Sequence, residues 1–165
     1  MKREFHVRFC ERLRGRFPWP TRPNCPVLRA LRSLKNQDMI KKLFTVDLYI
    51  KVRKNRFDAK NLSSNGSWET LHSEHPFTTE RLLVGTFSAA EPALTTLVKN
   101  ITPRGFFKKS PQIVIQPMEL IDGGLSEVEE RIFKELAHGS GAHKVVLHTG
   151  SELTDSEAIQ LIRSV

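Results

Sequence analysis

The chain has 165 residues, 39% of them hydrophobic, and a formal net charge of +8. This length suits a single domain with its own core, and no apolar run approaches the roughly 20 residues that a membrane-spanning helix needs. The charge is uneven, because residues 1–38 contain ten Lys or Arg against three acids, whereas the remainder is nearly neutral. We therefore do not expect nucleic acid as a partner of the main part of the chain.

The first 38 residues differ in composition from all that follows. They carry four prolines and eight arginines, so we expect residues 1–38 to form a disordered basic extension, or to lie outside the natural product if translation begins at Met39 and not at Met1. Both cysteines of the chain, Cys10 and Cys25, lie in this extension, so no disulfide could cross-link the core. We therefore expect a reducing, intracellular compartment.

The same extension also offers an alternative role, which is attachment of the protein to a membrane surface or to nucleic acid through its basic residues. Four apolar residues recur at a spacing of four, which on a helix would form an apolar ridge flanked by arginines. Such a basic amphipathic helix can bind an anionic membrane, which would place a cytoplasmic protein at the inner membrane. These residues are Phe5, Phe9, Leu13 and Phe17.

Three strands are predicted in close succession after residue 42. Residues 43–52, 56–62 and 67–74 are rich in β-branched and aromatic residues, and Asn55 and the Asn65-Gly66 pair between them are typical turn residues. The economical arrangement is an antiparallel meander.

A long helix is predicted next, opened by Thr78 or Thr79 and running from Glu80 to about Ile101. Pro92 should kink or split it, because proline lacks the amide donor and crowds the preceding turn. The predicted buried side consists of Leu82, Leu83, Phe87, Leu94, Leu97 and Val98.

The last third of the chain predicts a strand–helix–strand unit followed by a final helix. Residues 112–116 and 143–148 predict strands, and the helix between them begins with the capping-box spacing of Ser126 and Glu129. Val128, Ile132 and Leu136 are predicted to form its buried face, with Gly139 and Gly141 at its end. The same box, at Thr154 and Glu157, predicts the last helix, with Ala158, Leu161 and Ile162 inward.

The expected fold is therefore α/β in the order βββαβαβα, with a mixed five-stranded sheet and packed helices in one domain, residues 39–165. Two regions resemble the MreB/actin-like (ribonuclease H-like) ATPase superfamily, and the resemblance covers one subdomain. The first is Met39–Ile50. The second comprises residues 107–111 (FKKSP), 126–131 and 141–147. The resemblance implies a ribonuclease H-like, actin-like half-domain.

Activity of that superfamily depends on elements that this sequence lacks. The resemblance implies a glycine-containing phosphate loop after the first strand, yet no glycine lies between Asp47 and Gly66. His148-Thr149-Gly150-Ser151 stands where the family has an acidic pair and a proline. We therefore expect no ATP as cofactor and a non-catalytic, cytoplasmic bacterial protein that acts through a protein partner or self-association, in cell-shape or envelope assembly.

The alternative is a metal-dependent nuclease or hydrolase of ribonuclease H-like fold. Such an enzyme requires several carboxylates to converge on divalent metal. The catalytic candidates are Asp47, Glu80, Glu91 and Glu119.

Two weaker sites are also suggested by the sequence. Gly123, Gly124 and Ser126 could present amides to an anion at a helix N-terminus, or could merely form the turn into the helix. An aromatic pair beside two lysines could form a partner-docking edge, at Phe106, Phe107, Lys108 and Lys109. The histidines match no zinc signature, and Tyr49 and Trp68 stand too far apart in the sequence to predict a stacking platform.

Overall fold

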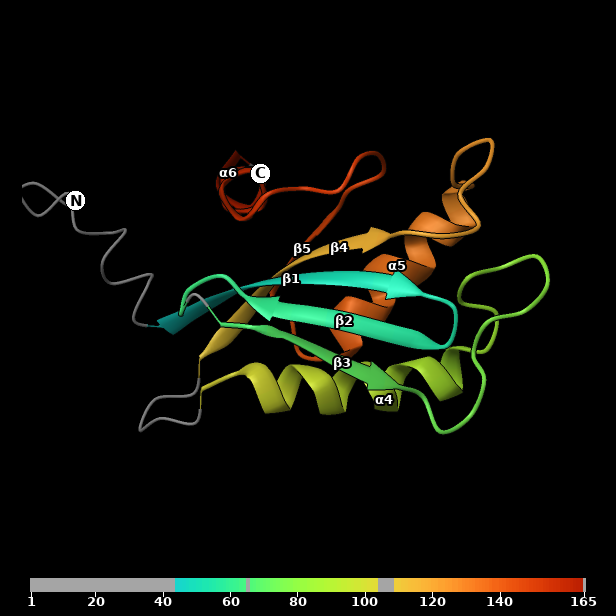
Figure 1. The fold of residues 1–165 in the computed structure, drawn as a ribbon, viewed down its shortest axis with the longest axis horizontal. Coiled ribbons are helices and arrows are strands. Elements are labelled where there is room, and N and C mark those ends of the chain that lie inside the picture. The colour runs from blue at the N-terminus through green and yellow to red at the C-terminus, as the bar shows by residue number, and fades with distance from the viewer. Residues whose placement is uncertain (1–43, 65, 104–108, 165) are drawn as a thin grey trace, which may run out of the picture. The chain divides into compact units, whose positions relative to one another are not determined.

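The computed structural model describes residues 44–64, 66–103 and 109–164, all within the unit Met39–Val165. The predicted α/β class, the order βββαβαβα and the mixed five-stranded sheet are confirmed. Figure 1 shows the elements, which are β1 (Thr45–Arg53), β2 (Arg56–Asn61), β3 (Trp68–His72), α4 (Phe87–Ile101), β4 (Ser110–Pro117), α5 (Glu127–Gly139), β5 (Lys144–Leu147) and α6 (Asp155–Ser164).

The strands lie in the order β3-β2-β1-β4-β5, with β1 at the centre. The meander β1–β2–β3 is antiparallel, whereas β4 runs parallel to β1 and β5 runs parallel to β4. Lys54 and Asn55 connect the paired residues Arg53 and Arg56, and Asn55 has a φ of 54°, which Asn tolerates better than most residues. The predicted turn at Asn55 is thus confirmed, and Asn65 lies outside the described residues.

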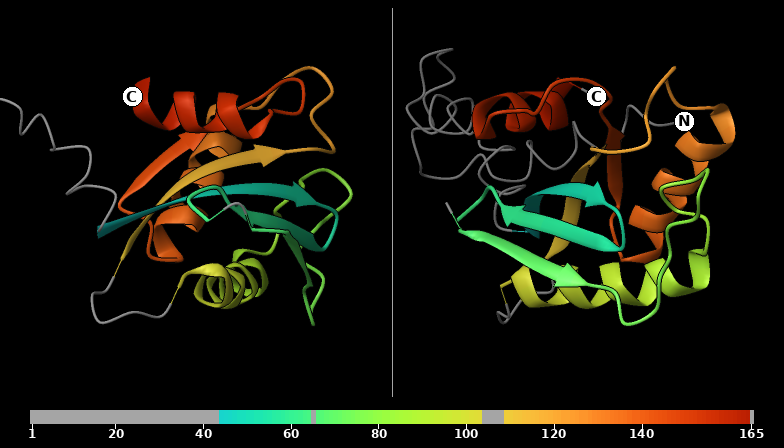
Figure 2. Two further views of the ribbon diagram at one scale, coloured as in Figure 1. Left: turned by 60° about the vertical axis from the view of Figure 1, so that its left-hand side comes forward. Right: turned by 45° about the vertical axis from the view of Figure 1, so that its right-hand side comes forward.

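The two faces of the sheet carry separate apolar clusters. Alternate residues of a strand point to opposite faces, so Val46, Leu48, Ile50 and Val52 of β1 pack with α4 and α5 on one face. Tyr49 points to the other face and packs with Val114, Val146, Ala158 and Ile162 under α6. Figure 2 shows α6 and α4 on opposite sides of the sheet.

Helix α4 begins at Phe87, so the predicted start at Glu80 is wrong. The preceding residues are held in a loop by tertiary hydrogen bonds. The Asn55 side chain accepts from the amides of Phe77 and Thr78 at 2.8 and 2.9 Å, and the Phe77 carbonyl accepts from Gly85 and Thr86. Phe77 is fully buried and stacks on Phe57 at 4.8 Å between ring centroids. Phe87 is 37% exposed, so its predicted burial is also wrong.

Pro92 does not split α4, which is one continuous helix. The later start places Pro92 in the second turn, so the amide it lacks removes a single hydrogen bond, to the exposed Ser88. One turn later, the Thr96 hydroxyl donates to the Pro92 carbonyl at 2.8 Å.

The start and end of α5 are confirmed, but its predicted buried face is partly wrong. Ser126 and Glu129 form the capping box, and Gly141 follows the helix with a φ of 101°. Val128 is 68% exposed, and the buried residues are Phe133, Leu136 and Ala137. The bulky Phe133 ring sets the rotation of the helix, so the stripe lies one residue away from Val128.

Helix α6 begins with the predicted box, since both the amide and the hydroxyl of Thr154 donate to Glu157 Oε2 at 2.7 Å. Ala158 and Ile162 are buried as predicted, and Leu161 is partly buried. Within the described part of the chain, no helix has the length and apolar character needed to cross a membrane.

Candidate functional site: the β3 edge and the groove beside it

Strand β3 is the outermost strand of the meander and pairs with β2 alone among the described residues. The amide of Ser73 donates to the Asn55 carbonyl on the β2 side at 3.0 Å. In an antiparallel strand, alternate residues point their backbone groups to the same side, so Glu69 and Leu71 also bond toward β2. The N–H and C=O groups of Trp68, Thr70 and His72 therefore point away from the sheet. All three residues are exposed.

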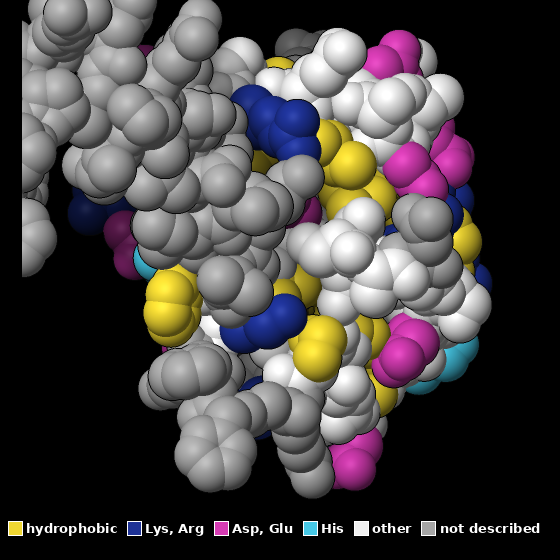
Figure 3. Space-filling model, turned by 90° about the vertical axis from the view of Figure 1, so that its left-hand side faces the viewer, with side chains coloured by type: hydrophobic (Ala, Val, Ile, Leu, Met, Phe, Trp, Pro, Cys, Tyr) yellow, Lys and Arg dark blue, Asp and Glu magenta, His cyan; other side chains and the backbone are white. Residues whose placement is uncertain are grey.

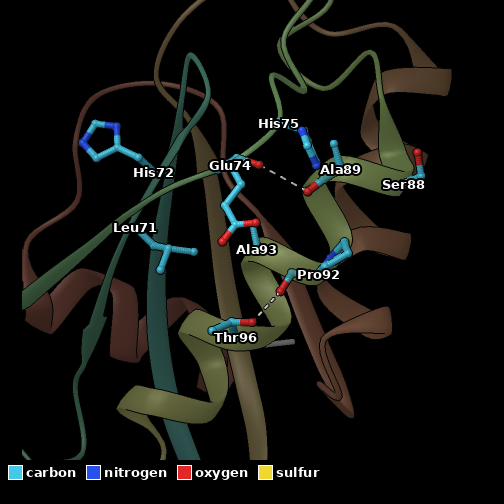
Figure 4. A pocket seen from close by; sticks show the side chains of 10 residues that line it. Leu71, His72, Glu74, His75, Ser88, Ala89, Pro92, Ala93 and Thr96 are labelled. Atoms are coloured by element: carbon cyan, nitrogen blue, oxygen red, sulfur yellow. Dashed lines mark hydrogen bonds between the residues drawn. The ribbon is translucent and has the colours of Figure 1, made fainter.

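A groove of about 260 Å³ lies between the end of β3 and helix α4. Figure 4 shows its walls: one is the chain from Leu71 to His75, the other is the exposed side of α4. The Ser73 hydroxyl donates to the Ala89 carbonyl at 3.4 Å and ties the two walls together. The α4 wall carries short side chains, namely Ser88, Ala89, Pro92, Ala93 and Thr96.

The two faces of β3 have different chemistry. Glu69 and Leu71 pair with Ala59 and Phe57, which are buried on the α4 side, so they share the groove face. Glu74 lines the groove itself, and Figure 4 shows its side chain extending along α4 toward Ala93. Neither Glu69 nor Glu74 forms an ion pair or a side-chain hydrogen bond with another residue in the described ranges. The groove lining thus contains one carboxylate, that of Glu74, together with the imidazoles of His72 and His75.

On its other face, β3 contributes Trp68 to an aromatic–lysine cluster consisting of Tyr49, Lys51, Lys60 and Trp68. The Trp68 and Tyr49 rings meet edge to face at 5.3 Å, and Lys51 Nζ lies 3.7 Å from the centroid of the Trp68 ring. Each interaction of this kind contributes about 0.5–1.5 kcal/mol. Tyr49 and Trp68, which seemed unrelated in the sequence, are thus brought together by the pairing of β1, β2 and β3.

The charges of this cluster are matched by carboxylates from the β5–α6 connection and α6. Lys51 pairs with Glu152, and Lys60 pairs with Asp155 at 2.6 Å. The hydrogen bond from Lys51 holds the pKa of Glu152 below its ordinary value. These contacts fix the Trp68 ring in place while leaving it 38% exposed.

Trp68 is one of four large hydrophobic residues exposed among those described, the others being Phe44, Phe87 and Val128. They lie on different elements. On the part of Figure 3 formed by described residues, hydrophobic side chains are likewise interspersed with charged ones. What distinguishes Trp68 is its position on a strand edge that pairs with no other strand in the described part of the chain.

The four predicted catalytic acids lie on different elements of the fold. Asp47 lies near the start of β1 on the α6 face, and its amide donates to Ser63 Oγ at 2.9 Å. Glu119 contacts Arg53, six residues further along the same strand, or about 20 Å away. Glu80 is exposed in the loop before α4, and Glu91 lies on α4 against Gly139. Among the described residues, no three of His, Cys, Asp or Glu are grouped closely enough to hold a metal ion.

The predicted anion site at the start of α5 is occupied by the helix's own cap. The Ser126 amide donates to Glu129 Oε2 at 2.9 Å, and the Glu129 amide donates to Ser126 Oγ at 3.3 Å. Gly123 and Gly124 have φ values of 86° and 90°, a conformation that favours glycine in a turn. The glycine pair is thus explained by backbone conformation.

The remaining predicted interaction residues fall mostly outside the described ranges. Of the four residues predicted to form a partner-docking edge, 106–109, the structure describes Lys109 alone, which is half-buried just before β4. Those outside are Phe106, Phe107 and Lys108, together with Phe5, Phe9, Leu13 and Phe17.

Comparison with known proteins gives a family but no activity. No family model matches the sequence. The chain is 32% identical over 125 residues to the uncharacterized protein YjaA of Escherichia coli K12, an alignment that covers 70% of this chain and 96% of YjaA. The chain belongs to the YjaA family. Because nearly all of YjaA is aligned, the shared domain accounts for almost the whole of that protein. Membership in the YjaA family establishes common ancestry, and the function must be inferred from the site.

Sequence reasoning missed the principal residues of this site, Trp68, Thr70 and Glu74. Their alternating pattern predicted a strand, and a meander whose first strand gains a parallel neighbour leaves its third strand at an edge. The position of β3 at the edge of the sheet could therefore have been predicted from the sequence. The groove beside it depends on where α4 packs, which no local pattern specifies.

Proposed function

We propose that this chain is a non-catalytic protein-interaction domain of ribonuclease H-like, actin-like architecture that binds an extended segment of a partner protein along β3. The observation that carries the proposal is the row of outward backbone groups at Trp68, Thr70 and His72, beside the groove on α4.

An extended segment placed against β3 would gain hydrogen bonds from this row, each contributing about 1 kcal/mol net. Its alternate side chains would point to the groove on one face and to Trp68 on the other. Peptide recognition by strand addition works in this way, since main-chain bonds supply affinity and side-chain pockets supply specificity. Natural proteins usually protect such an edge with proline, bulges, charged side chains, a very short strand or a covering element. Of these devices, β3 has a short length of five residues and the charged Glu69. β3 is a regular strand without proline.

The observed sheet supports the actin-like part of the proposal. The resemblance at residues 39–50 and 107–147 implies an antiparallel meander followed by parallel strands, and β4 and β5 do run parallel to β1. The same resemblance makes bacterial cell-shape or envelope assembly the first process in which to seek the partner.

ATP has no part in the proposed function. Where the superfamily has a phosphate loop after the first strand, β1 runs directly into the tight turn at Lys54 and Asn55. Thermal unfolding with and without millimolar ATP and Mg²⁺ tests this point: the melting temperature should not change, and a rise would contradict it.

Strand addition can be tested with a proline at the edge. Peptides selected by the full chain from a random phage library should bind wild type and lose about tenfold in affinity for the Thr70→Pro variant. The Thr70 amide points away from β2, so proline there removes a donor to the partner without breaking the β2–β3 ladder. Proline also removes the hydrogen bond from the Thr70 hydroxyl to Asp58 Oδ1, so Thr70→Val, which loses that bond alone, should bind like wild type. The circular dichroism of Thr70→Pro should stay that of wild type.

A matched control places proline at the first residue of α5, Glu127→Pro. Proline is well tolerated at this helical position, and Ser126 before it is already extended. Binding should be unchanged. Equal affinity of the selected peptides for wild type and Thr70→Pro would refute binding along β3.

A further inference from the structure

We infer that the segment bound along β3 is basic, with Lys or Arg on the side that faces α4 and apolar or aromatic residues on the side that faces Trp68. This inference rests on the proposed function and specifies the partner's chemistry.

The first step is the position of the incoming side chains. A strand added to β3 would lie about 4.8 Å from it, and its residues would alternate between the two faces of the sheet. On the α4 face, its side chains would lie beside Leu71 and enter the groove between Glu74 and α4. Glu69 shares this face, two residues before Leu71 and about 7 Å away along the strand.

The second step is the charge of that face. Glu74, His72 and His75 are the titratable residues of the groove lining, which has no Lys or Arg. Glu69 and Glu74 lack ion-pair partners among the residues described. A Lys or Arg in the partner would give these carboxylates a counter-charge. The short side chains of Ala89 and Ala93 leave room for its aliphatic stem, which prefers apolar contact.

The third step concerns the opposite face. Trp68 is partly exposed and fixed by Tyr49 and Lys51, so its ring is ready to pack against a neighbour. Cross-strand pairs of aromatic and β-branched residues stabilise sheets. Alternation of basic and apolar residues is therefore the pattern that matches both faces of β3 at once.

The net charge of the whole chain makes the test stringent. Because the chain carries a net charge of +8, non-specific attraction favours an acidic peptide and opposes a basic one. A preference for the basic peptide would thus come from a local acidic surface.

The experiment uses three fluorescein-labelled peptides of eight residues, each with Val at every second position and Lys, Gln or Glu at the others. Fluorescence anisotropy with the full chain should show that the Lys peptide binds about fivefold more tightly than the Gln peptide at low salt. Salt should reduce this difference. The Thr70→Pro substitution should weaken binding of the Lys and Gln peptides alike.

Glu69→Gln combined with Glu74→Gln should reduce the affinity for the Lys peptide to that for the Gln peptide. The control changes the same charge elsewhere, Glu127→Gln with Glu135→Gln on α5, and should leave all affinities unchanged. Two results overturn the inference alone: Lys and Gln peptides that bind equally well in a Thr70-dependent manner, or a Lys preference that survives the Glu69/Glu74 double substitution. If none of the three peptides binds in a Thr70-dependent manner, the proposed function fails with it.

Discussion

The hydroxyl group of Tyr49 donates a hydrogen bond to Oε1 of Gln116, and both residues are fully buried. The Gln116 amide group donates in turn to the carbonyls of Gly150 and Ser151, each at 3.0 Å. The amide of Leu153 donates to the Tyr49 hydroxyl at 3.2 Å. This network joins the central strands to the β5–α6 connection. The connection carries Glu152, which pairs with Lys51, and leads into Asp155 at the start of α6, which pairs with Lys60.

Replacing Gln116 with Leu should lower the free energy of unfolding by about 2–3 kcal/mol. Leucine has similar bulk but leaves the Tyr49 hydroxyl without its acceptor and two carbonyls without their donor. Urea unfolding measures the change. Thr149→Ala, at an exposed position in the same connection, is the control and should stay within about 0.5 kcal/mol of wild type. A Gln116→Leu variant as stable as this control would show that the network does not anchor the connection.

Tyr49 should make the protein sensitive to alkaline pH. Burial is the main cause that raises its pKa above the ordinary value of 10.0. Above about pH 10 the unfolded chain releases this proton while the folded chain keeps it, so stability falls as pH rises toward the folded-state pKa. Urea unfolding between pH 9 and 11 should show a steeper loss for wild type than for Tyr49→Phe, by up to about 1.4 kcal/mol per pH unit. Parallel curves would contradict this assignment.

The cap of α6 should be visible in the titration of Glu157. Its pKa is lowered first by the hydrogen bond from the Thr154 amide and then by that from the Thr154 hydroxyl. Thr154→Ala removes only the second bond, so the pKa should rise part of the way to its ordinary value, as carboxyl-carbon NMR would show. The melting temperature should fall by roughly 3–5 °C. Thr154→Ser keeps a hydroxyl and should restore both values, whereas an unchanged Glu157 pKa in Thr154→Ala would refute the cap.

Elements defined by neighbouring residues could be predicted from the sequence. The two capping boxes depend on residues three apart, and the meander depends on alternation and on the turn at Asn55. Each of these patterns involves residues close together in the chain, so a single sequence is enough to predict the structure it forms.

Features that depend on distant residues could not be predicted. The start of α4 is delayed because the amides of Gly85 and Thr86, which a helix from Glu80 would use, donate to the carbonyl of Phe77. Phe77 is itself held by the side chain of Asn55, 22 residues earlier in the chain. The Tyr49–Trp68 contact requires the register of three strands, and the groove requires the packing of α4 beside β3. The groove and the aromatic–lysine cluster of the proposed site are such long-range features, which explains why the sequence indicated other residues.

The side of α5 that is buried differs from the side that the sequence pattern predicts. Spacing alone favours a stripe through Val128, yet Val128 is 68% exposed and Phe133 only 2%. Phe133→Ala should therefore cost about 3–5 kcal/mol, because it opens a cavity between α5 and the sheet. Val128→Ala, on the same helix, should change stability by less than about 0.5 kcal/mol. Chemical unfolding of the two variants decides between the two rotations. A stripe through Val128, Ile132 and Leu136 would leave Phe133 off the buried side, so Val128→Ala would then be the costly substitution and Phe133→Ala the mild one.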